Sequence, residues 1–90
     1  MLTSIIFFNV ERDKINAVAE QLAGLKEMSE VFSVSGAFDL IAIVRVNKAD
    51  DLSRLVTEEM IKIEGITKTD TMLAFKAYSR HDLESMFSFD

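Results

Sequence analysis

Two short segments carry the side chains that could bind a ligand in this 90-residue chain. Residues 36–39 separate two apolar runs, and Thr69 and Thr71 lie two residues apart in a later β-rich run. A carboxylate at Asp39 could hold an ammonium group, because a hydrogen bond to a charged group contributes about 1.5–3 kcal/mol. Asp39 could equally accept local backbone N–H bonds in a turn, as aspartate often does.

The neighbouring candidates also have two interpretations each. Gly36 either supplies a positive φ angle to the turn or lets another backbone approach closely. Phe38 either forms the wall of a pocket or packs the end of a hairpin. Thr69 and Thr71 share one face of a strand, where two hydroxyls and nearby backbone N–H groups could bind a carboxylate. Threonine is also common in strands simply because it is β-branched.

Other kinds of chemistry have little support in the sequence. The chain has no Cys and a single histidine, His81, so we predict no catalytic residue, no metal site and no cofactor. A net charge of −5 argues against direct binding to nucleic-acid phosphates. No apolar run is long enough to span a membrane, and the apolar N-terminus lacks the basic residues of a signal peptide. We therefore expect a cytoplasmic protein.

Hydrophobic periodicity predicts the elements that position these side chains. Four segments rich in β-branched and aromatic residues predict strands, the last of them within a longer run: 2–10, 30–35, 40–46 and 66–78. Two segments with apolar residues at helical spacing predict amphipathic helices: 12–25 and 52–63. The order β-α-β-β-α-β predicts an α+β, ferredoxin-like fold, with a four-stranded antiparallel sheet and two helices on one face.

The predicted sheet is apolar on both faces, although the helices would cover only one of them. Strand 40–46 carries Ile41 and Ile43 on the face opposite to Leu40, and strand 2–10 carries Ile and Phe at both parities. An apolar patch of this kind usually marks an interface, because burying one large apolar side chain contributes about 1.5–3 kcal/mol. We expect a second copy on the open face; the alternative is a monomer with a well-filled core.

Two motifs of the sequence resemble the effector-binding (RAM, regulation of amino acid metabolism) domain of Lrp/AsnC transcriptional regulators. Residues 34–40, Val-Ser-Gly-Ala-Phe-Asp-Leu, resemble the segment V-x-G-x-[YF]-D-hydrophobic. Gly65 and residues 66–71, Ile-Thr-Lys-Thr-Asp-Thr, resemble the segment G-V-x-x-T-x-T. One amphipathic helix separates the two motifs here and in the family, and the resemblance extends to Tyr78.

The resemblance implies a non-catalytic module that binds an amino acid or a similar small effector. It implies dimers whose sheets pack face to face and form a dimeric α/β barrel. It further implies that these dimers assemble into octamer- or decamer-like rings, and that effectors bind between the dimers. Residues 1–78 would form the domain, and residues 79–90 a tail that could dock on a neighbouring subunit. The residues implied to bind the ligand are Gly36, Phe38, Asp39, Thr69 and Thr71.

The chain resembles a stand-alone version of this module, without the helix-turn-helix domain of full-length members. It would then act on transcription indirectly, for example by mixing with full-length Lrp/AsnC regulators. Two other functions fit the same order of elements. A small dimeric α/β-barrel enzyme, such as a monooxygenase, would show polar groups converging between helices and sheet, where this chain is apolar. An ACT-like regulatory module pairs its sheets side by side, which an apolar open face disfavours.

Overall fold

Alternating apolar side chains place strand β1 (Leu2–Val10) in the middle of the sheet. In the computed structural model, which describes residues 1–80, Ile6 and Phe8 of β1 are completely buried under the helices. Strand β3 (Leu40–Val46) runs antiparallel beside β1 and buries Leu40, Ala42, Val44 and Val46 on the same face. This alternation is the pattern that a sheet covered on one side requires.

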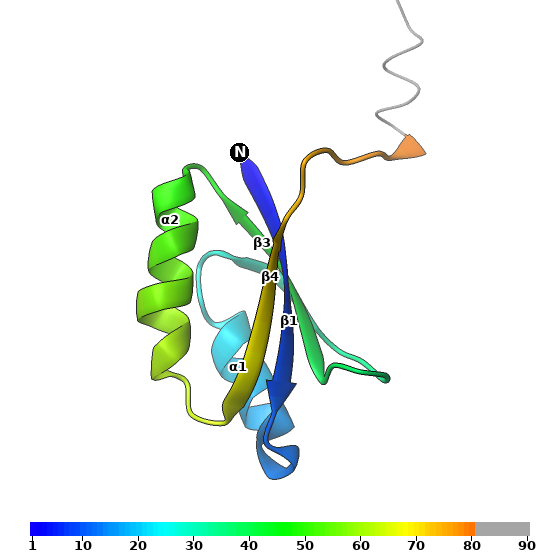
Figure 1. Cartoon of the computed structure of the whole chain (residues 1–90), viewed down its shortest axis with the longest axis vertical. Helices are drawn as coiled ribbons and strands as arrows, with labels where there is room; N and C mark the ends of the chain where they lie inside the picture. The colour runs from blue at the N-terminus through cyan, green and yellow to red at the C-terminus, as the bar shows by residue number, and fades with distance from the viewer. Residues whose placement is uncertain (81–90) are drawn as a thin grey trace, which may run out of the picture.

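The remaining strands complete the predicted ferredoxin-like topology. Strand β2 (Met28–Ser33) pairs with β3, and β4 (Ile66–Leu73) pairs with β1, which gives an antiparallel sheet with the order β2-β3-β1-β4. Both helices lie on one side of this sheet, and the other side is bare (Figure 1). The predicted α+β fold, βαββαβ with two helices on one face, is confirmed.

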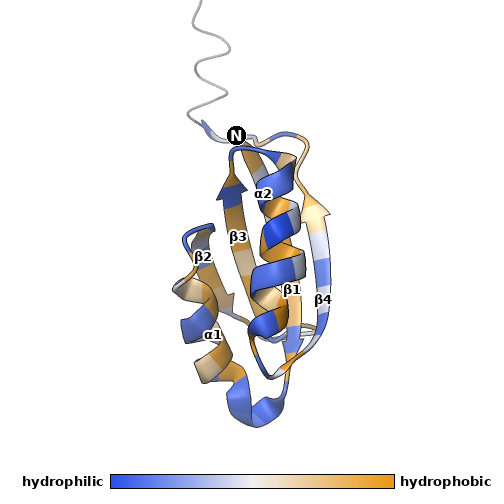
Figure 2. Cartoon of the chain, turned by 90° about the vertical axis from the view of Figure 1, so that its left-hand side faces the viewer, coloured by the Kyte–Doolittle hydropathy of each residue, from blue (hydrophilic) through white to orange (hydrophobic). Residues whose placement is uncertain are grey.

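The helices cover the sheet through a few large apolar side chains. Helix α1 (Ile15–Ala23) follows a 3₁₀ turn at Arg12–Lys14 and buries Val18 and Leu22. Helix α2 (Ala49–Arg54) continues as a π-helical stretch (Leu55–Glu59) and a 3₁₀ turn (Met60–Lys62), which bury Leu55 and Met60. We call these three consecutive pieces, residues 49–62, the second helical segment. Seen from the helix side, α2 has a hydrophilic outer surface, whereas β1 and β3 behind it are hydrophobic (Figure 2). None of the helices within residues 1–80 is long and apolar enough to cross a membrane.

Gly65 makes the tight turn between the second helical segment and β4 possible. Its φ angle is +105°, and a Cβ atom there would lie 3.0 Å from the Lys14 side chain and 3.1 Å from that of Val18. The Gly65 carbonyl also accepts a hydrogen bond of 2.8 Å from the Glu11 N–H, just after β1. Both backbone conformation and space therefore require glycine at this position.

Several predicted element boundaries differ from the structure: helix α1 is shorter than the predicted range 12–25, and two further differences have a clear physical cause. The second strand spans Met28–Ser33 instead of residues 30–35, because Met28 pairs with Val44 and an irregularity between Met28 and Glu30 interrupts the alternation. The second helix begins at Ala49 instead of Leu52, since the Asp51 carboxylate accepts the Lys48 N–H at 3.2 Å and caps the first turn.

The open face of the sheet is apolar at its centre. Ile5 lies opposite Ile43, and Phe7 lies opposite Ile41, and none of these four side chains is covered by a helix. On the flanking strands Phe32 is 46% exposed and Met72 is 50% exposed. The predicted apolar open face is therefore present in the single chain.

Candidate functional site

Asp39 joins the loop before β3 to the end of β1. Its Oδ2 atom accepts a hydrogen bond of 2.8 Å from the Val10 N–H, and its own N–H donates to the Phe8 carbonyl at 2.9 Å. The Asp39 carbonyl accepts a further bond of 3.1 Å from the Val34 N–H. The carboxylate thus accepts a backbone N–H, as one interpretation held, but that N–H belongs to a distant strand instead of the turn itself.

Two further contacts join the rest of this loop to β1. The Phe38 ring lies 4.9 Å from the Phe7 ring, and the Asn9 side-chain amide donates a hydrogen bond of 2.9 Å to the Ala37 carbonyl. Gly36 has a φ angle of +114°, and no atom lies within 4 Å of where its Cβ would be. Within the chain Gly36 therefore serves the turn, and Phe38 packs the end of the hairpin. We call Gly36, Phe38 and Asp39 the loop half-site.

Thr69 and Thr71 lie on the outer strand of the sheet. They sit opposite Phe8 and Ile6 in the β1–β4 ladder, so their side chains lie on the helix side, where both residues are exposed. Because the Ala74 N–H donates to the Thr3 carbonyl at 2.9 Å, the alternating antiparallel pattern turns the N–H groups of Thr69 and Thr71 outward. We call these two residues the strand half-site; each offers a hydroxyl and a backbone N–H at a free edge.

The two half-sites do not meet within one chain. The loop half-site adjoins β3, the strand half-site belongs to β4, and β1 separates the two strands. The Asp39 carboxylate lies one hydrogen bond from Val10 on the β3 side of β1, whereas Thr69 lies beside Phe8 on the other side of that strand. This hydrogen bond, one strand spacing of about 4.8 Å and an offset of two residues along the strand together separate the half-sites by roughly 10 Å. The ammonium and carboxylate groups of one α-amino acid are attached to the same carbon and cannot bridge this distance.

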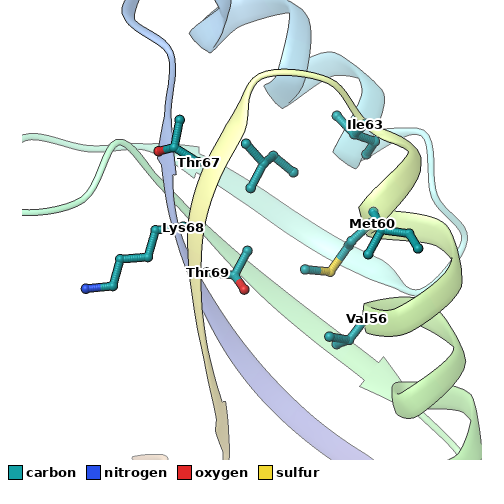
Figure 3. A pocket seen from close by; sticks show the side chains of 8 residues that line it. Val56, Met60, Ile63, Thr67, Lys68 and Thr69 are labelled. Carbon is teal, nitrogen blue, oxygen red and sulfur yellow. The ribbon is translucent and has the colours of Figure 1, made fainter.

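A cavity of about 240 Å³ lies beside the strand half-site, between β4 and the second helical segment. Val56, Met60, Ile63 and Ile66 supply its apolar wall, and the Thr69 side chain points into it (Figure 3). The Lys68 side chain turns to the other face of β4 (Figure 3). Sequence reasoning missed this cavity, since helical spacing of apolar residues also describes an ordinary core.

A second hollow, of about 300 Å³, lies at the far end of β3 and is lined largely by charged residues. Of its cations, Arg54 is already paired with Asp51 at 3.6 Å and with Glu58 at 3.7 Å. None of the predicted site residues lines this hollow. Across residues 1–80 no three His, Cys, Asp or Glu side chains are grouped so that they could hold a metal ion.

Comparison with known proteins agrees with this fold. The family described as the Lrp/AsnC ligand binding domain matches residues 3–83. An uncharacterized HTH-type transcriptional regulator from Pyrococcus abyssi is 35% identical over 72 residues, which are 80% of this chain and 46% of that protein. The chain thus spans about half the length of the curated relatives it matches.

Solved structures include short proteins of the same fold. TTHA0845 from Thermus thermophilus superposes with a TM-score of 0.83 and is 36% identical; the match covers 89% of this chain and all of that one. Escherichia coli AsnC shares the fold, with a TM-score of 0.79 at 17% identity, over 84% of this chain and 52% of AsnC. The chain belongs to the Lrp/AsnC family and corresponds to its ligand-binding domain.

Proposed function

We propose that this domain binds an amino acid or a similar small effector between copies of itself, and that binding changes its assembly. The observation that carries the proposal is the separation of two complementary half-sites by about 10 Å across β1. One half-site offers a carboxylate at Asp39, and the other offers hydroxyls and outward N–H groups at Thr69 and Thr71. A zwitterion fits both only when they come from different copies.

In the proposed complex, Asp39 of one copy binds the α-ammonium group of the effector. Its Oδ2 atom is held by the Val10 N–H, which fixes the carboxylate at the end of β1 and leaves the other oxygen for the ligand. Thr69 and Thr71 of another copy bind the α-carboxylate through hydroxyl and N–H groups. A hydrogen bond between charged and neutral groups of this kind contributes about 1.5–3 kcal/mol.

The apolar open face supports a dimer with sheets packed face to face. Ile5, Phe7, Ile41 and Ile43 form its centre, and Phe38 extends the apolar surface onto the loop half-site. Dimers of this kind would then assemble further, into an octamer- or decamer-like ring that brings loop and strand half-sites together. An effector that contacts both would stabilise the larger assembly by its differential affinity for the two states.

We propose a regulatory and non-catalytic role in the cytoplasm, because the relatives are named as transcriptional regulators. The net charge of −5 argues against contact between this domain and DNA, so it would act through full-length regulators that share its interfaces. We further propose that residues 1–78 form the domain; most of the proposed docking tail, 79–90, lies outside the described residues. One related structure, of a transcriptional regulator from Neisseria meningitidis, is titled as a complex with L-Met.

Light scattering with and without each of the twenty amino acids tests the proposal. We expect a dimer or larger assembly whose mass changes with a subset of amino acids, and calorimetric titration should give saturable binding of the same subset. A monomer that binds none of them would overturn the proposed function and leave only the fold. Co-purification with a full-length regulator tests the indirect route, and exclusive self-association would contradict it.

A further inference from the structure

We propose that the cavity beside Thr69 receives the side chain of the effector, and that the effector is therefore an amino acid with an apolar aliphatic side chain. This inference rests on the proposed function, because it assumes that the strand half-site binds the α-carboxylate. It adds which amino acids the site accepts. Aliphatic amino acids, such as methionine and leucine, are the ligands that the chemistry of the cavity favours.

The cavity adjoins the strand half-site through Thr69 itself. The Thr69 side chain points into the cavity, while its N–H faces the free edge of the sheet (Figure 3). A ligand whose carboxylate lies at this edge can therefore direct its side chain past the Thr69 side chain, between β4 and the helical segment. Thr71 lies two residues further along the same face and outside the cavity lining, where it can serve only the carboxylate.

The walls of the cavity select against polar side chains. Val56, Met60, Ile63 and Ile66 are aliphatic, and among the described lining residues Lys68 is the only ionisable one. The Lys68 side chain points to the opposite face of β4, away from the aliphatic wall of the cavity (Figure 3). A ligand amide or carboxylate entering here would lose part of its hydration and could gain only the hydroxyls of Thr67 and Thr69 from the side chains beside it, which is unfavourable.

The size and origin of the cavity fit a side chain better than a whole ligand. Its volume of about 240 Å³ is below the roughly 300–1,000 Å³ typical of sites that enclose a complete drug-sized molecule. It exists because the second helical segment leaves the helix side of β4 uncovered; every residue after Ile66 in that strand is exposed. Met60 is a nearly completely buried lining residue that can adjust to ligands of different shape, because methionine is flexible.

Calorimetric titration with pairs of amino acids of similar size but different polarity tests the inference. We expect methionine to bind about 10–100-fold more tightly than glutamine, and leucine more tightly than asparagine by a similar factor. Equal or tighter binding of glutamine or asparagine would overturn the assignment of the cavity and leave effector binding intact. Failure of every amino acid to bind would overturn the proposed function and this inference together.

A variant that fills the cavity provides the second test. In Val56→Phe a larger side chain enters the cavity from the helical segment, and methionine binding should weaken at least about tenfold. Ser53→Phe, at an exposed position of the same segment, is the matched control and should bind as the unsubstituted chain does. If Val56→Phe lowers the native mass without any amino acid present, a neighbouring copy fills the cavity and the inference is wrong. Unchanged methionine affinity in Val56→Phe would also overturn it.

Discussion

Substitution of Asp39 can separate its contribution to folding from its proposed contribution to binding. The Asp39 carboxylate accepts the Val10 N–H at 2.8 Å, and Val10 is only 7% exposed. Asp39→Ala removes this acceptor and leaves a donor at the strand end without its protein partner. Asp39→Asn keeps an oxygen in the same place but removes the charge. The two variants should therefore differ in stability and agree in binding.

The expected magnitudes follow from the hydrogen bond. A bond to a charged acceptor contributes about 1.5–3 kcal/mol, and we expect the lower end because the Asp39 side chain is only half-buried. Asp39→Ala should therefore lower the free energy of unfolding by about 1–2 kcal/mol, and Asp39→Asn by less than about 1 kcal/mol. Both should weaken effector binding at least about tenfold, because neither presents a charge to the ammonium group.

Urea unfolding at one fixed protomer concentration measures the first effect, since the stability of an oligomer depends on concentration. Calorimetric titration under conditions where each variant is folded measures the second. Equal stability of the unsubstituted chain and Asp39→Ala would refute the structural role. Full affinity in Asp39→Asn would refute the idea that the carboxylate holds the ammonium group.

Two further predictions concern the fold and the dimer. Gly65→Ala should destabilise the domain by about 2–4 kcal/mol in thermal unfolding, because residue 65 has a φ angle of +105° and an added Cβ would contact Lys14 and Val18. Gly24→Ala is the control and should change the stability by less than about 1 kcal/mol in that assay. Ile43→Glu places a charge on the apolar open face and should convert the assembly to monomers, as measured by light scattering. Ala17→Glu, on the exposed side of α1, is the control and should leave the mass of the assembly unchanged. An unsubstituted chain that is already monomeric would contradict the prediction.

Runs of β-branched and aromatic residues made most of the fold predictable from the sequence. The predicted bounds of β1 and β3 agree with the structure because a run rich in such residues covers the whole of each strand. The start of β2 was wrong by two residues, since Met28 lies before the β-rich run on which the prediction relied and joins the strand through an irregularity. A local pattern cannot reveal such an irregularity, which depends on pairing with a strand further along the chain.

The candidate site was less predictable than the fold, for the same physical reason. The partner of Asp39 is Val10, 29 residues away, so its role could not be derived from the turn alone. The distance between the half-sites depends on β1 lying between β3 and β4. The cavity could not be anticipated either, because Val56, Met60 and Ile63 follow the helical spacing of ordinary core residues whether or not a strand covers them completely.

Mixing two binding-deficient variants tests most directly whether each effector site is shared between copies. Asp39→Ala impairs only the loop half-site, and Thr69→Val combined with Thr71→Val impairs only the hydroxyls of the strand half-site. After equal amounts are unfolded and refolded together, about one quarter of the sites should contain two intact halves and bind methionine with normal affinity. Calorimetric titration should then recover roughly that stoichiometry. If the mixture binds no more methionine than the separate variants, the half-sites do not act together across copies, and the proposal of a shared effector site is wrong.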